Sequence, residues 1–535
     1  MVEHLRFLPA GNGALLVELD DLETTLTLLD ALQVDRPQGV LELVPAARTL
    51  LVRFDTLVTD RFALVDAICI IDLSVRSSRH GEMFDIPVVY DGEDLNDVAE
   101  LLGWSVDELI SRHIGATYTV AFTGFAPGFA YMTCDDPAFN VPRRNNPRVR
   151  IPASSVALGG KFGGIYPADS PGGWQLLGRT PLKMWDANRS PAALLAPGDR
   201  VRFRDMAKGA AVPGSVPSSS RTETVASRVS AEGLLVTRAD RPALFQDLGR
   251  PGQAGQGVSE SGALDRGSLV EANLCVGNAR SAAVIEIAYG GFAIKADRPV
   301  TLALTGAPTP MTIRTTGGQS FSAPGGEPFA LDAGDELTLE FPPQGTRSYL
   351  AIRGGFAVEK VLDSAATDTL AKVGPLPIVT GDVLVPADEP VCAVDPYRPR
   401  PKALPKAGDI IDLDIVLGPR TDWFTPIGLS TLLMQEWQVT AESSRVGVRL
   451  AGDHPLERSV SAELPSEATL LGAIQVPHNG QPVLFLADHP LTGGYPVIGV
   501  VAAHHLDLTS QIPMGAKIRF NAIAAFDPLI RETDR

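Results

Sequence analysis

The sequence predicts a mainly β protein with an α+β segment at its amino-terminal end. Short apolar runs recur between Gly and Pro turns in the second half of the chain, among them "GLLVTRA", "VTLALTG", "DELTLEF" and "QPVLFLAD". This spacing is typical of barrels and sandwiches. The chain has 535 residues, of which 44% are hydrophobic and 20% charged, so three or four well-cored domains are expected.

The amino-terminal segment alternates strands and helices. "GALLVEL" and "ARTLLVRFD" are apolar runs of strand length, whereas "DLETTLTLLDALQ" and "TDRFALVDAICII" place apolar residues near helical spacing. This order predicts a small α+β domain over residues 1–80.

The next segment, residues 81–207, begins with two helices and continues as strands. Asp94 is expected to cap the first helix, which ends at Gly103, and Ser105 begins the capping box "SVDE" of the second. That second helix places His113 on its apolar face. Beyond it, "TYTVAFTG", "SSVALGG", "GGWQLLGRT" and "DRVRFRD" have the character of strands and turns.

The second half is set apart by its composition. "KGAAVPGSVPSSSRTETVAS" lacks apolar periodicity and is interpreted as a linker over residues 208–227. A weaker break, "DPYRPRPKALPKAGD", is rich in prolines that prevent regular structure. We therefore expect two further β domains, at 228–394 and 395–535. The clearest helix in this half is "ALDRGSLVEANLCVGN", which Gly277 can end.

Composition also excludes several classes of protein. A net charge of −17 argues against a nucleic-acid partner. No apolar run is long enough to span a membrane, and the first residues lack the pattern of a secretory signal. The four cysteines lie far apart, and no histidine has ligand spacing, so a cytoplasmic protein without a metal site is expected. Lys183 in "PLKMWD" lacks the preceding Met of a biotin carrier, so no covalent biotin is expected on this chain.

Candidate sites occur where polar groups stand among glycines. "GFAPGF" and "DSPGGW" in the first half, and "QDLGRPGQ" and "SESGALDR" in the second, let backbone N–H groups approach a carbonyl or oxyanion. Asp247, Asp265 and Glu286 are candidate acid–base groups there. The alternative is that these glycines form barrel corners and that Asp265 caps the following helix. His113 either faces a cleft or is a satisfied core histidine.

Longer motifs resemble a known pair of proteins. "YTVAFTGFAPGFAYM" and "VPRRNNPRVRIPASSVALGGKFGGIYPADSPGGWQLLGRTP" resemble the B subunit of bacterial 5-oxoprolinase, also called allophanate hydrolase subunit 1 or the KipI family. "LFQDLGRPGQAGQGVSESGALDRGSLVEANLCVGN" and "LGAIQVPHNGQPVLFLADHPLTGGYPVIG" resemble the C subunit, the allophanate hydrolase subunit 2 or KipA family. Together the two resemblances cover nearly the whole chain, in this order.

The resemblance implies cyclophilin-like β-barrels, one in the first half and two in the second, packed on each other. It also implies ATP-dependent opening of 5-oxo-L-proline to L-glutamate. Because the chain has no nucleotide-binding motif, ATP is expected to bind with or on a separate A subunit of the LamB/YcsF type.

Two other functions share these modules. The same pair forms the carboxyltransferase region of urea carboxylase, which implies carboxyl transfer to urea or a related amide. A KipI/KipA-like regulator that binds a histidine kinase is the third possibility.

The site residues expected from motifs and resemblance form two groups. The arginines at 143, 144 and 148 are alternative clamps for a substrate carboxylate. Relatives of the C type often have Lys where "GGYPVIG" has Val497, so chemistry that needs that lysine is in question here. The expected catalytic residues are His113, Asp247, Asp265 and Glu286. The expected substrate contacts are Gly124, Phe125, Gly128, Phe129, Arg143, Arg148, Ser170, Gly172, Gly173, Trp174, Gln246, Arg250, Gly262, Ala263, Gly493, Gly494 and Tyr495.

Overall fold

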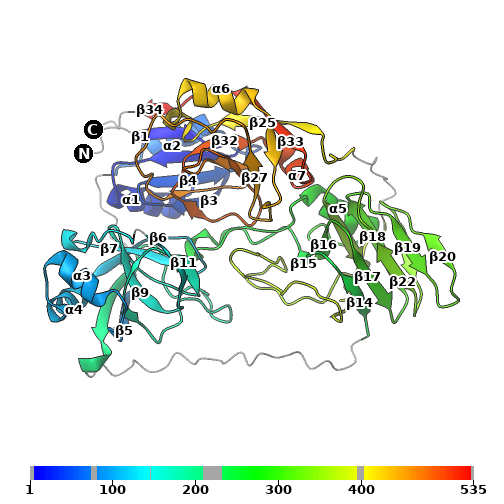
Figure 1. Ribbon diagram of the computed structural model, residues 1–535, viewed down its shortest axis with the longest axis horizontal. Helices are drawn as coiled ribbons and strands as arrows, with labels where there is room; N and C mark the ends of the chain where they lie inside the picture. The colour runs from blue at the N-terminus through cyan, green and yellow to red at the C-terminus, as the bar shows by residue number, and fades with distance from the viewer. Residues whose placement is uncertain (1–4, 74–80, 145, 209–231, 395–402, 532–535) are drawn as a thin grey trace.

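A computed structural model describes residues 5–73, 81–144, 146–208, 232–394 and 403–531. Nearly all of the predicted linker lies outside these residues, as does the start of the second predicted break. Figure 1 shows an amino-terminal sheet beside a carboxy-terminal barrel, with a first barrel and a middle domain at opposite ends of the molecule. Among the described residues, no helix is both long and apolar enough to cross a membrane.

The amino-terminal sheet has the strand order β3-β4-β2-β1-β34. Two helices, α1 (Leu22–Val34) and α2 (Arg61–Cys69), contribute to the core on one of its faces. The strand β34 comes from the far end of the chain and pairs antiparallel with β1, an addition that the division at residue 80 did not anticipate. The strands are β1 (Leu5–Pro9), β2 (Ala14–Glu18), β3 (Val40–Pro45), β4 (Thr49–Phe54) and β34 (Leu529–Arg531).

Both faces of this sheet are buried. In β2, Leu15 and Val17 pack with the helices, while Leu16 on the opposite face packs with Ala254 and Leu491 from the second half. This explains why "GALLVEL" is a continuous apolar run rather than an alternating one.

The first barrel has seven strands in the order β12-β9-β10-β7-β6-β13-β5. A β-bridge between Val89 and Arg179 joins the two ends of this order, so the barrel is nearly closed. A two-stranded ribbon, β8 with β11, lies beside it. The strands are β5 (Met83–Val88), β6 (Tyr118–Thr123), β7 (Ala130–Cys134), β8 (Arg148–Ile151), β9 (Ser155–Gly159), β10 (Phe162–Ile165), β11 (Ser170–Gly172), β12 (Gln175–Arg179) and β13 (Arg200–Asp205).

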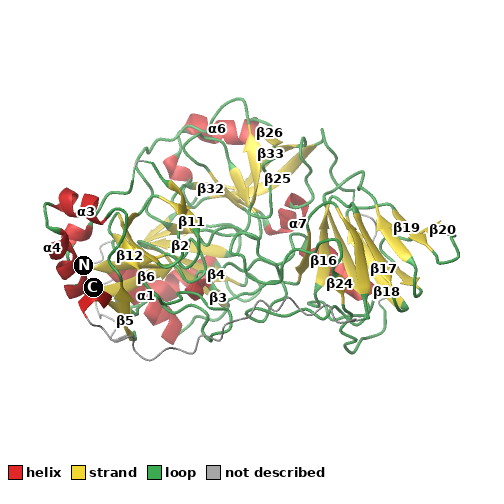
Figure 2. Ribbon diagram, turned by 60° about the horizontal axis from the view of Figure 1, so that its bottom comes forward, coloured by secondary structure: helices red, strands yellow, loops and turns green. Residues whose placement is uncertain are grey.

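Two helices, α3 (Leu95–Leu102) and α4 (Val106–Gly115), lie on the side of this barrel away from the middle domain (Figure 2). As predicted, Gly103 ends α3 in the left-handed conformation, and the Ser105 side chain caps α4. Asp94 occupies the N-cap position of α3, as predicted, but its side chain does not cap the helix. Its carboxylate makes no cap hydrogen bond, because it accepts instead from Arg144, Arg148 and the amide of Leu176.

The middle domain consists of two sheets, β20-β19-β22-β17-β14-β24 and β15-β16-β23-β18-β21, that share one apolar core. The predicted helix is present as α5 (Arg266–Cys275), and Gly277 follows it with a φ of 74°. The strands are β14 (Leu234–Ala239), β15 (Ala243–Gln246), β16 (Val284–Ala288), β17 (Phe292–Ala296), β18 (Val300–Gly306), β19 (Met311–Arg314), β20 (Ser320–Ser322), β21 (Pro328–Leu331), β22 (Glu336–Leu339), β23 (Arg347–Ile352) and β24 (Val383–Leu384).

The carboxy-terminal barrel is closed, in the order β25-β32-β29-β30-β27-β26-β33. It carries two helices that the sequence pattern did not reveal, α6 (Pro426–Met434) and the short α7 (Leu506–Thr509). The Thr425 cap and Pro426 at the start of α6 were an available signal. The barrel strands are β25 (Ile410–Leu417), β26 (Trp437–Val439), β27 (Gly447–Ala451), β29 (Ala473–Gln475), β30 (Val483–Phe485), β32 (Val497–Val501) and β33 (Lys517–Ala524). A separate two-stranded ribbon is formed by β28 (Glu467–Ala468) and β31 (Thr492–Gly493).

The two barrels have the same topology. In each, the first strand pairs in parallel with the last, β5 with β13 and β25 with β33. The remaining strands follow in the same order, and the β28–β31 ribbon matches β8–β11. The correspondence aligns "SPGGW" with "LTGGY", the double-glycine segments of the two halves.

Candidate functional site at the junction of the two halves

Glycine-rich loops from the two halves meet. The loop "GFAPGF", between β6 and β7, contacts the loop that follows β15. The amide of Gly128 donates to the carbonyl of Gln256 at 2.9 Å, and Thr123 Oγ1 donates to the carbonyl of Ala254 at 2.8 Å. The "GFAPGF" loop of the first half and the glycine-rich loop after β15 in the second half are therefore in direct contact.

Two glycines make this approach possible. Gly257 has a φ of 77°, and a Cβ there would lie 2.9 Å from the carbonyl oxygen of Ala126. A Cβ on Gly124 would overlap Thr492 Oγ1 of the second half. Larger residues at either position would push the loops apart.

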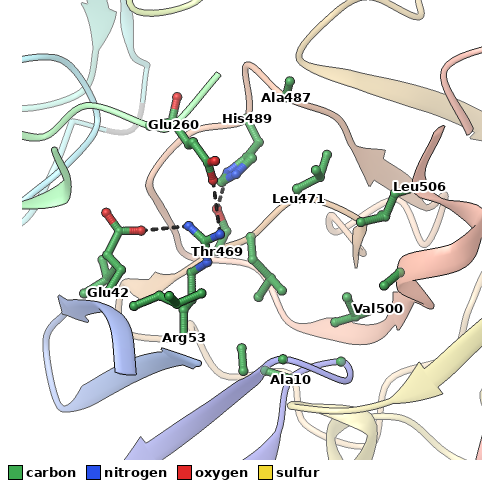
Figure 3. Close-up of a pocket in the computed structure, with 18 of the residues that line it drawn as sticks. Ala10, Glu42, Arg53, Glu260, Thr469, Leu471, Ala487, His489, Val500 and Leu506 are labelled. Atoms are coloured by element: carbon green, nitrogen blue, oxygen red, sulfur yellow. Dashed lines mark hydrogen bonds and ion pairs between the residues drawn. The ribbon is translucent and has the colours of Figure 1, made fainter. Parts of the chain in front are cut away.

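A cavity of about 250 Å³ lies next to this contact, between the amino-terminal sheet, the segment 258–266 and the carboxy-terminal barrel (Figure 3). Its lining includes Ser259, Glu260 and Ser261 of "SESGALDR" and His489 of "ADHPL". The cavity is thus built from both halves and from segments that carry the sequence motifs.

Charged groups in the cavity wall are paired. Arg53 Nη1 lies 2.9 Å from Glu42, and its Nη2 lies 3.1 Å from Glu260. Arg266 lies 3.0 Å from the other oxygen of Glu260. Burial raises the pKa of Glu260, but the charges of Arg266 and Arg53 outweigh it and hold that pKa below its usual value. Figure 3 shows Arg53 between the two glutamates.

His489 also lines the cavity. Its Nδ1 lies 2.9 Å from the carbonyl oxygen of Pro490, which can only accept, and 3.2 Å from Thr469 Oγ1, which itself donates to that carbonyl. This arrangement favours the tautomer in which Nδ1 carries the proton. Burial lowers the pKa of His489, so the ring is neutral. Nε2 is then an acceptor with no partner among the described residues. The side chain that carries it lines the cavity.

A buried ionic network supports the wall behind the cavity. Arg445 Nε donates to Asp488 at 2.9 Å, and Arg445 also bonds to Glu286 and to the carbonyl of Gly262. Ser261 Oγ donates to Asp488 at 2.6 Å. The network therefore ties the cavity segments of the middle domain to the carboxy-terminal barrel.

The three predicted catalytic carboxylates lie outside the cavity lining, each with structural partners. Asp247 accepts from Ser364 Oγ and from the amides of residues 249 and 365, at 2.7–2.8 Å. Asp265 caps α5 through Ser268 and accepts from Gln511 Nε2, and burial with the charge of Asp507 raises its pKa.

Glu286 accepts from the amide of Leu264, from Tyr349 and from Arg445. The catalytic roles of all three carboxylates stay predictions, and their structural roles are evident.

His113 is buried on α4, where its ring packs against strands of the first barrel. Its Nδ1 is 2.7 Å from Tyr90 Oη, and its ring stacks on Phe203 with a centroid separation of 4.4 Å. Burial lowers its pKa to about 3. These contacts favour the core-histidine interpretation.

The predicted substrate contacts of the first half gather around one aromatic cluster, in which Phe125, Phe129 and Trp174 are neighbours. A Cβ on Gly172 would lie 2.6 Å from Tyr166 Oη of the same cluster.

The polar members of this group differ in their availability. Arg148 is held by Asp94 and Glu93, whereas Arg143 is exposed. Ser170 Oγ donates to the carbonyl of Ala168, and the Gly173 carbonyl accepts from the Arg144 amide.

Most of the predicted substrate contacts of the second half form hydrogen bonds or strand pairs within the protein. Gln246 and Arg250 bond to the carbonyls of residues 367 and 366, and the amide of Ala263 donates to the carbonyl of Asp247. Gly493 belongs to the β28–β31 ribbon.

Gly494 and Tyr495, next to that ribbon, are exposed. The ring of Tyr495 packs against His478, with a centroid separation of 5.2 Å. None of these predicted contacts, from Gln246 to Tyr495, lines the cavity.

Sequence reasoning missed Arg53, Arg266 and His489. Arg53 had a signal, since it interrupts the apolar run "LLVRF" of β4, where a buried charge requires a partner. His489 had only the "DHP" triplet, which does not specify a ligand.

The described residues contain one group of possible metal ligands, Asp414 with His504 and His505. His504 Nε2 lies 3.0 Å from Asp414, but Nδ1 of His505 accepts from the Asp414 amide. The lone pair of that nitrogen is therefore already used, and we do not assign a metal site to this group.

Two family models match the chain. "Carboxyltransferase domain, subdomain C and D" matches residues 5–195, and "Carboxyltransferase domain, subdomain A and B" matches residues 256–522. The crystal structure of TTHA0988 is similar over 95% of this chain and 99% of that one, with a TM-score of 0.80 and 32% identity.

Curated relatives match each half. The C subunit of 5-oxoprolinase from Escherichia coli (strain K12) is 33% identical over 297 residues, which is 54% of this chain and 90% of the relative. The B subunit of 5-oxoprolinase from Escherichia coli O157:H7 is 44% identical over 128 residues, 23% of this chain and 59% of the relative. Urea amidolyase of Lachancea kluyveri is 30% identical over 346 residues, 61% of this chain and 18% of the relative.

Proposed function

Because this chain belongs to the carboxyltransferase-domain family that includes the B and C subunits of 5-oxoprolinase, we propose that it supplies both of these parts in one polypeptide. With ATP and a separate A subunit of the LamB/YcsF type, it opens 5-oxo-L-proline to L-glutamate. The observation that carries the proposal is the cavity, which segments of both halves build together.

The size of the cavity suits a small cyclic amide. Drug-sized ligands occupy pockets of ≈ 300–1,000 Å³, and this cavity of about 250 Å³ falls just below that range. Its wall combines apolar side chains such as Leu41, Phe54 and Leu470 with the charged groups around Glu260. A lactam ring with a carboxylate needs both kinds of contact.

The chemistry requires help at a weakly electrophilic carbon. Amide resonance protects the lactam carbonyl, and ATP supplies activation by phosphorylating the amide oxygen. Water attack on that carbon and departure of the ring nitrogen open the ring and leave a glutamyl phosphate, which a second water hydrolyses to L-glutamate and phosphate. In the ring-opening step, one proton must leave the water and one must reach the departing nitrogen. In this proposal His489 Nε2 takes the first proton and returns it to the nitrogen.

The proton-carrying role fits the surroundings of His489. The Pro490 carbonyl favours the tautomer that leaves Nε2 free, and burial keeps the ring neutral and ready to accept. Arg53 and Arg266 line the same cavity, and both pair with Glu260. Their positive charges favour an anionic ligand, which would share the two arginines with Glu260.

The test is a reconstituted assay. The chain is co-purified with the candidate LamB/YcsF-type protein, and L-glutamate release from 5-oxo-L-proline is measured with and without ATP. We expect release only when both proteins and ATP are present. Absence of release from a stable complex of the two proteins would refute the proposal.

A second candidate function is carboxyl transfer, which the similarity to urea amidolyase favours. In that case, carboxybiotin on a separate carrier protein would donate to urea or a related amide. Urea-dependent consumption of ATP in the presence of a biotin carboxylase with its carrier, and no glutamate release with the LamB/YcsF-type protein, would select this function.

A further inference from the structure

An aromatic cluster on the first barrel has polar atoms that the fold does not use. The cluster consists of Phe125, Phe129, Tyr131, Tyr166 and Trp174. Phe129 is its centre, with ring centroids 4.9 Å from Tyr131, 5.3 Å from Tyr166 and 5.4 Å from Trp174. It shares no residue with the lining of the cavity at the junction.

Three hydrogen-bond donors in this cluster have no partner among the described residues: Tyr131 Oη, Tyr166 Oη and Trp174 Nε1. The three residues are only 8%, 2% and 6% exposed. None of the three polar atoms is both fully buried and without a partner, so each is reached by solvent. Buried phenol and indole groups normally find a partner in the protein, so three unpaired together call for an explanation.

Arg143 adds a fourth donor group. Its neighbours Arg144 and Arg148 are both committed to Asp94, whereas Arg143 is exposed and forms no ion pair within the described part of the chain. Burial raises the pKa of Tyr131 to about 12, and the charge of Arg143 opposes that rise, as it does at Tyr166. The amide of the next residue, Arg144, donates to the carbonyl of Gly173 at 2.8 Å, which places Arg143 beside the turn that leads into Trp174.

All four of these polar groups can donate hydrogen bonds. Both phenols stay protonated at physiological pH, so they can donate, and the indole and guanidinium groups can only donate. Such a set selects an acceptor-rich group, and the guanidinium selects a negative one. The exposed ring of Phe125, held at a φ of 66°, adds an apolar surface beside the donors.

We propose that Tyr131, Tyr166, Trp174 and Arg143 form a binding site for an oxyanion, a carboxylate or a phosphate, carried by a small molecule whose body packs on the ring of Phe125. This site is separate from the cavity and does not depend on the oxoprolinase proposal. The double-glycine turn assists it, because the absence of a Cβ at Gly172 leaves room for Tyr166 Oη.

The test is isothermal titration of the full chain with two probes in parallel, 5-oxo-L-proline as a ring-bearing carboxylate and inorganic phosphate. The variants are Arg143→Gln and Tyr166→Phe. The matched control is Arg150→Gln, since Arg150 is an exposed arginine of the same segment that pairs with Asp169. Arg143→Gln and Tyr166→Phe keep most of the side-chain volume, and Arg143 is exposed, so these two variants are expected to fold.

We expect at least one probe to bind and its dissociation constant to rise tenfold or more in both variants, with Arg150→Gln unchanged. The probe that behaves in this way identifies the group as carboxylate or phosphate. Binding of neither probe overturns the proposal. Binding that both variants leave unchanged also overturns it, because it would place the anion elsewhere, for example in the cavity.

Discussion

Arg420 of the carboxy-terminal barrel holds Glu18 of the amino-terminal sheet from a position 402 residues further along the chain. Its Nη1 and Nη2 lie 3.1 and 3.2 Å from the two carboxylate oxygens, and the guanidinium also bonds to Glu467. All three side chains are at most 10% exposed. The contact places the two ends of the chain in one assembly, in agreement with the expected packing of the two halves.

The first prediction concerns acid stability. Arg420, Arg48 and Arg6 outweigh the effect of burial and lower the pKa of Glu18 to about 2 from an ordinary value of 4.5. A lowered carboxylate pKa stabilises the fold above pH 4.5, and this stabilisation is lost as the pH falls toward 2. Glu18→Gln should therefore cost about 2 kcal/mol at pH 7, allowing for solvent screening. Denaturant unfolding at several pH values checks this, and a cost that does not shrink by about pH 3 would contradict it.

The second prediction is Arg420→Met. The change leaves Glu467 buried and without its cation, so a loss of about 3–5 kcal/mol in unfolding free energy is expected. Arg519→Met is the control, because Arg519 forms an exposed pair with Asp412. That control should unfold like the unmodified protein. Equal behaviour of the two variants would show that the buried ion pairs of Arg420 with Glu467 and Glu18 do not stabilise the fold.

His113→Gln is the third prediction. The imidazole fills a site among Tyr90, Tyr118 and Phe203 and bonds to Tyr90, so its loss should cost about 1–3 kcal/mol of stability. Turnover per folded molecule should be retained. Thermal unfolding and the reconstituted assay measure the two quantities separately. Lost turnover with unchanged stability would instead favour a catalytic His113.

Local features of this fold were predictable because their causes are local. The cap at Ser105, the end of α3 at Gly103 and the cap of α5 by Asp265 each depend on a few consecutive residues. The glycines of "GFAPGF" also indicated close backbone contact, although the sequence did not say with what.

The features that were missed depend on long-range contacts. Asp94 has the residue type and position of a cap, but ion pairs with Arg144 and Arg148 take its carboxylate. Arg53 and His489 meet at the cavity only because β4 and the β30–β31 loop are brought together by the fold. No periodicity within either segment predicts that the two residues lie together.

The fourth prediction separates two roles of Asp265. Asp265→Asn keeps an oxygen that can cap α5 through Ser268 and removes the charge. Because Ser268 and Gln511 already occupy the carboxylate, turnover in the reconstituted assay is expected to stay within about threefold of normal, less than general acid–base loss would give. A fall of ~10²–10⁴-fold at unchanged melting temperature would establish the acid–base role that the sequence suggested.

The last prediction concerns His489. In His489→Gln, the new amide N–H can still donate to the Pro490 carbonyl and the side chain keeps a similar volume, so the melting temperature should change little. An amide cannot take up a proton near neutral pH, so kcat for glutamate release should fall by ~10²–10⁴-fold. His478→Gln is the control, because His478 packs on Tyr495 and is not part of the cavity lining. If both variants keep normal turnover, His489 is not the proton carrier.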